Sequence, residues 1–218
     1  MGAAKVLLVE GQDEIKVLPV LCEAQGVNLA ELAITLKDKK GYTELLKGIP
    51  SEIKSSDSGE LEILGIVIDA DASANNRWTA VRNKLVESGY KNLPKEPKKE
   101  GTIIPGGGDD DLPTVGVWLM PNNSTEGMLE TLIAFLVKDR SPGSLWQHAE
   151  QSTNHACEHH KSFSSTKKPK AVLHTWLAWQ KKPGLAIGTA IIASYLDTDN
   201  DPTVDHFISW IKRLFQLT

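Results

Sequence analysis

Three carboxylates come directly after two aliphatic segments of the 218-residue chain. Glu10 follows residues 5–9, and Asp69 and Asp71 follow residues 61–68. Short aliphatic segments of this kind are typical of buried parallel strands, and ligands bind beyond the carboxyl ends of such strands. Carboxylates gathered there repel one another unless a cation lies among them, and oxygen ligands suit Mg²⁺ and Mn²⁺. The sequence therefore predicts a Mg²⁺ or Mn²⁺ site to which Asp69 and Asp71 both reach, beside Glu10.

A second acidic pair, Glu126 and Glu130, is predicted on one face of a helix over residues 126–137, because residues four apart share a side of an α-helix. The preceding loop, residues 121–125, follows another predicted strand and would emerge at the same sheet edge. The pair is a candidate for a second metal, which would help to stabilise the attacking and leaving oxygens of a phosphodiester. For Glu126 the alternative is a solvated charge near a helix N-terminus.

Basic residues near the same edge are candidates for phosphate binding. Arg77 lies in the first turn of a helix predicted over residues 75–87, where the helix dipole favours anions; pairing with a nearby carboxylate is an equally weighted alternative. Lys39 and Lys40 follow a strand predicted over residues 32–36. Such lysines would contact a nucleic-acid backbone without reading its sequence, although exposed lysines usually only solvate a surface.

A further group, His155, Cys157, His159 and His160, has the residue types of a zinc site. It falls inside a helix predicted over residues 144–161, where only His155 and His159 share a face. No second pair of ligands accompanies it in the sequence, so zinc binding is not the favoured interpretation.

The elements that position these residues alternate between strand and helix. This order predicts βαβ units and an α/β fold with a mainly parallel, four-stranded, Rossmann-like sheet flanked by helices. The predicted strands cover residues 5–9, 32–36, 61–68 and a weaker pair, 102–104 and 115–120; helices cover 13–25, 43–47, 75–87 and 126–137. Later helices are predicted over 144–161, 170–180, 185–195 and 202–215. We predict an α/β domain over residues 1–138 and a helical C-terminal extension over residues 139–218 packed on it.

Composition narrows the classes of protein to consider. Hydrophobic residues make up 40% of the chain and charged residues 24%, which excludes disordered and fibrous proteins. The two cysteines are too far apart for a disulfide scaffold. The first residues lack the pattern of a signal peptide, and no apolar stretch reaches the roughly 18 residues that a membrane helix requires. We therefore expect a cytoplasmic protein without membrane contact.

The net charge of −4 hides a difference between the two parts of the chain. Residues 1–138 hold 15 basic and 21 acidic residues, whereas residues 139–218 hold 9 and 7. Part of the acidic excess falls at predicted strand ends, where a divalent cation would offset it. The net charge is therefore a poor argument against a phosphate-bearing substrate.

The ends of the first and third strands resemble the two motifs of the toprim family, which includes topoisomerases, bacterial primases and OLD-type nucleases. The matching segments are residues 6–14, with Glu10, and residues 66–71, with Asp69 and Asp71. In element order the resemblance covers residues 4–121, and it is greatest to small stand-alone toprim proteins of unknown function with a helical tail. It implies that Glu10 acts as general acid or base and that the two aspartates bind Mg²⁺. The pair Glu126 and Glu130 resembles the carboxylates that OLD-type nucleases add for a second metal.

This resemblance implies a Mg²⁺-dependent protein that acts on phosphodiester bonds of DNA or RNA, first of all a nuclease. The chain departs from the family where residues 72–77 lack the glycine that usually follows the aspartate pair. It also has no candidate topoisomerase tyrosine and is too short for the additional parts of a primase. The alternative is a non-catalytic toprim-fold protein that binds nucleic acid or a partner and has a regulatory role. The sequence is compatible with a homo-oligomer.

Overall fold

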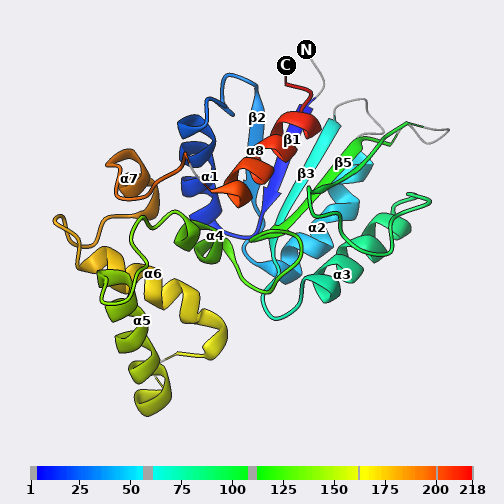
Figure 1. Cartoon of the computed structure of the whole chain (residues 1–218). Helices are drawn as coiled ribbons and strands as arrows, with labels where there is room; N and C mark the ends of the chain where they lie inside the picture. The colour runs from blue at the N-terminus through cyan, green and yellow to red at the C-terminus, as the bar shows by residue number, and fades with distance from the viewer. Residues whose placement is uncertain (1–3, 56–60, 108–111, 162, 200, 218) are drawn as a thin grey trace.

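A single five-stranded sheet forms the centre of the computed structural model, which describes residues 4–55, 61–107, 112–161, 163–199 and 201–217 (Figure 1). Its strand order is β2-β1-β3-β5-β4. Four strands run parallel: β1 (Ala4–Val9), β2 (Ile34–Asp38), β3 (Leu61–Asp69) and β5 (Thr114–Met120). The predicted α/β class and the mainly parallel sheet are confirmed.

The predicted number of four strands is wrong by one. The fifth strand, β4 (Thr102–Ile104), is only three residues long and pairs antiparallel with β5 at the edge of the sheet. Both members of this pair lie close to the weaker strands expected from the sequence. The sheet has five strands because both members of this weaker pair join it, with β4 at residues 102–104 as predicted.

The helices follow the predicted order, and their ends shift by a few residues except in the second helix, which was predicted over residues 43–47 and continues to Lys54. The first part of the chain contains α1 (Gln12–Ala24), α2 (Tyr42–Lys54), α3 (Ala74–Glu87) and α4 (Leu129–Phe135). The second part contains α5 (Leu145–His155), the π-helical turn η2 (Ala156–His160), the 3₁₀ turn η3 (Ser165–Lys167), α6 (Lys168–Ala178), α7 (Ile187–Ile192) and α8 (Pro202–Leu214). The start of α8 agrees with the predicted residue 202, and it is capped by the Asp201 side chain, which accepts from the N–H groups of Thr203 and Val204.

The two faces of the sheet belong to two separate hydrophobic clusters. Successive side chains of a strand point to opposite faces, so Leu7 and Val9 pack with α1, α4 and α8, whereas Val6 and Leu8 pack with α2 and α3 (Figure 1). The cluster on the α1 side also contains residues of α5, α6 and α7. The helices that follow residue 138 therefore share one hydrophobic core with the sheet.

Two facing glycines let α8 lie close to the sheet. Gly65 of β3 and Gly116 of β5 are directly paired across the parallel ladder. A Cβ atom at Gly65 would meet Leu214 of α8 at 3.2 Å, and one at Gly116 would meet it at 2.4 Å. The fully buried side chains of Trp118, Phe207 and Trp210 pack beside this contact, with ring centres 5.3–5.9 Å apart.

None of the helices in the described part of the chain has the length and apolar character needed to span a bilayer.

The close approach of Gly116 in β5 to Leu214 in α8 predicts that substitutions at these two residues affect stability in a coupled way. We expect Gly116→Ala to lower the free energy of unfolding by about 1–3 kcal/mol, because Leu214 is buried and has no room to move aside. We expect Leu214→Ala alone to cost about 2–5 kcal/mol through the cavity it leaves. The double variant should cost less than the sum, as measured by urea denaturation.

Gly48→Ala in α2 is the matched control, because its new Cβ meets only the far end of the flexible Lys39 side chain at 3.2 Å. It should leave stability unchanged or raise it, since alanine favours a helix. Strictly additive costs for Gly116→Ala and Leu214→Ala would show that the two residues do not interfere.

Candidate functional site

A cavity of about 580 Å³ lies at the carboxyl ends of β1, β2 and β3. Backbone atoms of Gly11 and Gly41 contribute to its wall, and Gln12 and Met128 border it. Its remaining lining consists of charged side chains: Glu10, Asp13, Glu14, Asp38, Asp69, Glu130, Lys40, Lys167 and Lys170. Six carboxyl groups thus face three ammonium groups in one cavity.

Glu10 and Asp69 lie side by side in this cavity, as the sequence predicts. Glu10 Oε1 accepts a hydrogen bond from the Asp69 backbone N–H at 2.8 Å. Asp69 Oδ1 in turn accepts from the backbone N–H of Leu129, the first residue of α4, at 3.0 Å. The two carboxyl groups therefore connect the ends of β1 and β3 with the start of α4.

Burial raises the pKa of both groups. Desolvation raises the pKa of Glu10 to about 7, although the Asp69 N–H and the charge of Arg77 act to lower it. The pKa of Asp69 is raised well above its usual value, first by desolvation and then by the negative charges of Glu10, Glu14 and Glu130. These carboxyl groups are close enough for each to disfavour the ionised form of the others.

Glu14 is a third member of the group, and it was not among the predicted site residues. It is only 7% exposed, and its Oε2 accepts from the backbone N–H of Gly11 at 3.1 Å. Desolvation, with the charges of Glu130 and Asp13, raises its pKa. The sequence did indicate that Glu14 could lie near Glu10, because the two residues are four apart where α1 begins.

Lys170 brings a positive charge from α6 into the same group. Its Nζ lies 2.5 Å from Asp13 Oδ2 and 3.2 Å from Glu130 Oε1. Burial lowers the pKa of Lys170, but the hydrogen bond to Asp13 and the charge of Glu130 outweigh it, and the pKa is raised overall. Sequence reasoning missed this role because Lys170 was predicted only as the first residue of a helix over residues 170–180, and its partners lie in other elements; α6 begins at Lys168.

Asp71 does not line the cavity that contains Asp69. Its backbone has φ of 47° and exchanges two hydrogen bonds of 2.8 Å with Gly127. Its carboxylate pairs with Arg77, whose guanidinium carbon lies 3.5 Å from the centre of the Tyr42 ring. Of the two interpretations of Arg77, pairing with a carboxylate is the one observed. Metal binding by Asp71 and phosphate binding by Arg77 remain predictions.

Glu126 and Glu130 do not share a helix face, so the predicted arrangement of this pair is wrong. The helix α4 begins only at Leu129, because Gly127 has φ of 138° and bridges to Asp71. Glu130 is 3% exposed and lines the cavity of Glu10. Glu126 is exposed and lines a neighbouring cavity of about 400 Å³ that also contains Asp71.

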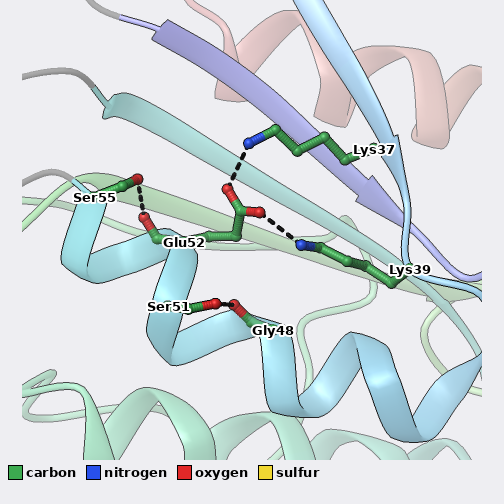
Figure 2. A network of polar contacts seen from close by, with 6 residues as sticks. All are labelled: Lys37, Lys39, Gly48, Ser51, Glu52 and Ser55. Carbon is green, nitrogen blue, oxygen red and sulfur yellow. Dashed lines mark hydrogen bonds and ion pairs between the residues drawn. The ribbon is translucent and has the colours of Figure 1, made fainter.

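The two lysines after β2 have different surroundings. Lys39 Nζ pairs with Glu52 Oε1 at 2.6 Å, and Lys37 pairs with the other oxygen of the same carboxylate at 2.8 Å (Figure 2). These contacts join β2 to the C-terminal part of α2. Lys40 has φ of 58°, is exposed and lines the cavity of Glu10. A role in phosphate binding thus fits Lys40 better than Lys39.

The carboxyl groups of the cavity fit a hard divalent cation in their chemistry. All of them offer oxygen ligands, and the carboxyl groups in the lining outnumber the lysines. As the side chains lie, no three His, Cys, Asp or Glu residues in the described ranges already surround a point that would hold an ion. Ion binding would therefore require side chains such as Glu130 to rotate away from their present partners.

Comparison with known sequences gives a family but no function. A family model described as "Protein of unknown function (DUF3226)" matches residues 4–216. No match is found among curated proteins.

Comparison with solved structures relates the fold to OLD proteins. The C-terminal region of the Burkholderia pseudomallei OLD protein has 15% sequence identity and a TM-score of 0.51, and the match covers 99% of this chain and 100% of that chain. The C-terminal region of the Xanthomonas campestris pv. campestris OLD protein has 14% identity and a TM-score of 0.48, with 99% and 95% covered. At these identities the likeness to the Burkholderia protein concerns the fold alone, an α/β sheet flanked by helices.

The raised pKa of Glu10 predicts how stability depends on pH without divalent ions. The folded protein keeps a proton on Glu10 up to about pH 7, whereas the unfolded chain releases it near pH 4.5. This group therefore lowers the free energy of unfolding as the pH rises through that window, by at most about 3 kcal/mol. We expect Glu10→Gln to be more stable than the parent at pH 8, by about 1–3 kcal/mol, and equally stable at pH 4.5.

Urea denaturation in EDTA at both pH values measures the effect. Glu62→Gln is the matched control, because Glu62 is exposed near the beginning of β3, the strand that ends at Asp69. It should change stability little at either pH. A Glu10→Gln protein that is less stable than the parent at pH 8 would contradict the burial argument.

Proposed function

The chain belongs to the DUF3226 family, whose description gives no function. We propose that it is a toprim-type, metal-dependent nuclease that cleaves phosphodiester bonds of DNA or RNA. One observation carries the proposal. Glu10, Glu14, Asp69 and Glu130 come from four separate elements and line a single cavity at the carboxyl ends of parallel strands. Such an edge is where open α/β sheets bind their ligands.

Carboxylates this close together lower the stability of the fold, so a purely structural role does not account for them. Buried ionised groups without full compensation destabilise a fold, and Lys170 is the cation that contacts Glu130. Gathering further carboxyl groups around one cavity is consistent with selection for a bound cation. The fold's likeness to the C-terminal region of the Burkholderia pseudomallei OLD protein and the toprim motifs around Glu10 and Asp69 are consistent with this use.

Three carboxyl groups are the proposed ligands for Mg²⁺ or Mn²⁺: Asp69, Glu14 and Glu130. Such an ion would polarise a phosphoryl oxygen and activate water for attack. Asp71 would join them only by leaving Arg77, and Glu126 only through the neighbouring cavity, so we give these two residues a lesser part.

Glu10 is the proposed general acid or base. A group of this kind works best when its pKa is close to the working pH, and burial raises the pKa of Glu10 to about 7. Its Oε1 is held by the Asp69 N–H, so the carboxyl group is fixed in orientation beside the proposed ligands. It would take the proton of the attacking water or return one to the leaving oxygen.

The three lysines of the cavity would bind the substrate's phosphates. Lys40 comes from the loop after β2, and Lys167 and Lys170 come from the start of α6, so they approach from two sides. Ammonium groups bind a phosphate backbone as point charges without reading base sequence. Lys170 is held by Asp13 and Glu130, which places its charge next to the proposed ligands.

The second candidate is a non-catalytic protein that binds nucleic acid or a partner. The pairing of Asp71 with Arg77 favours it, because a metal-binding role for this aspartate is then blocked in the observed conformation. This candidate predicts nucleic-acid binding without any Mg²⁺-dependent cleavage, so the assay for cleavage separates the two.

The nuclease proposal predicts which carboxyl groups are essential. With Mg²⁺ or Mn²⁺ and single- or double-stranded DNA or RNA, we expect cleavage by the parent chain and at least about a hundredfold loss in Asp69→Asn and Glu10→Gln. Asp71→Asn should lose less, because Asp71 does not line the cavity. Gel-based cleavage assays measure the rates, with Glu62→Gln as the control that retains full activity. Undiminished cleavage by Asp69→Asn would sink the assignment.

Lys170 should affect turnover and ion binding in opposite directions. Lys170→Met removes a positive charge that contacts Glu130, so we expect Mg²⁺ to bind about threefold to tenfold more tightly, equivalent to roughly 1 kcal/mol. Cleavage at saturating Mg²⁺ should fall at least about tenfold, because the phosphate loses a cation. Calorimetric titration and rate assays measure the two effects. Lys168→Met, two residues earlier and outside the cavity lining, should change neither; weaker Mg²⁺ binding by Lys170→Met would contradict the charge argument.

A further inference from the structure

The end of α5 has a geometry that sequence patterns for an ordinary α-helix do not anticipate. From Ala156 to His160 the chain forms the π-helical turn η2, which Lys161 ends with φ of 48°. A π-helix is closed by bonds between residues five apart, so residues four and five apart come to lie on the same side. This brings His159 and His160 together towards His155, where an α-helix would bring only His159.

The distances from the His155 ring to the other two rings are close to those between imidazoles bound to one ion. The ring centres of His155 and His159 are 4.4 Å apart, with planes at 42°, and those of His155 and His160 are 5.7 Å apart, with planes at 54°. Two imidazoles bound tetrahedrally at a metal–nitrogen distance of about 2.0–2.1 Å have ring centres roughly 5 Å apart. The observed pairs lie on either side of that value, and the rings are tilted instead of stacked flat.

The three rings are free to complete such a site. All three side chains are exposed, and none makes a hydrogen bond or ion pair within the residues that the structure describes. The ring nitrogens do not yet converge on one point, but rotation about side-chain torsions is cheap for exposed rings without partners. Cys157 does not take part, because its thiol lies 3.7 Å from the carbonyl oxygen of Phe163 and donates to it.

We propose that His155, His159 and His160 form a binding site for a divalent transition-metal ion such as Zn²⁺, Ni²⁺ or Cu²⁺. Imidazole nitrogens suit these ions, whereas Mg²⁺ and Ca²⁺ prefer oxygen. His155 and His159 supply the first two ligands, His160 supplies the third, and water completes the coordination. The site is built only from α5 and η2 and contains none of the residues of the carboxylate cavity. It therefore does not depend on the proposed nuclease function.

Calorimetric titration of the full chain with Ni²⁺, and separately with Zn²⁺, tests the site in an excess of Mg²⁺ that occupies the carboxylates. We expect one ion per chain, bound at least about tenfold more weakly by His155→Ala/His159→Ala. His160→Ala alone should weaken binding by a smaller factor, about twofold to fivefold, because it removes only the third ligand. Circular dichroism checks that the exposed substitutions leave the fold intact.

Two controls separate this site from other binding. His174→Ala/His206→Ala removes two exposed histidines of α6 and α8 that contact no other ring in the described chain, and it should retain the parent's affinity. Asp69→Asn should also retain it, even if that variant loses cleavage. Unchanged affinity in His155→Ala/His159→Ala would overturn the proposal. An equal loss in His174→Ala/His206→Ala or in Asp69→Asn would overturn it as well, because the ion would then bind elsewhere.

Discussion

The repulsion between carboxyl groups gathered at one edge of the sheet is the constraint on which the arrangement of this molecule depends. Parallel strands bring Glu10 and Asp69 to the same edge, and the starts of α1 and α4 add Glu14 and Glu130. Two means of compensation are visible: backbone N–H groups of Gly11, Asp69 and Leu129 donate to three of the carboxyl groups, and Lys170 contacts the fourth. Burial, and after it the neighbouring negative charges, still raise the pKa values of Glu10, Glu14 and Asp69.

Compensation by Lys170 makes the second part of the chain a component of the site. The residues after 138 carry the positive excess of the sequence, and α6 directs one of those charges between Asp13 of α1 and Glu130 of α4. The same residues share a hydrophobic core with the sheet, where Leu214 of α8 fits against Gly65 and Gly116. Packing on this face of the sheet thus holds α6, which carries the charge of Lys170. Substitutions in this core, far from the cavity, can therefore alter the electrostatics of the cavity.

How much the sequence could predict depends on how local each interaction is. Glu10 and Asp69 were found because a strand end is recognisable from its own residues, and most helices were found for the same reason. Asp71 lies outside the cavity lining, and its backbone bridges to Gly127, more than fifty residues distant. Glu126 was placed wrongly because that same bridge delays the start of α4 to Leu129. The contacts of Lys170 and of Lys39 depend on partners in other elements, which no local pattern specifies.

Proton and cation compete for the same carboxyl groups, and this competition bears on the role of Glu10. Without an ion, burial keeps a proton on Glu10 up to about pH 7. Metal ligands must be deprotonated, so binding of an ion to Asp69 and Glu14 would release protons and weaken as the pH falls. A positive ion beside Glu10 would also offset the charges that surround it and lower the pKa of its carboxyl group. Glu10 would then be ionised more fully at neutral pH when the ion is present, which favours proton acceptance over proton donation in the metal-bound site.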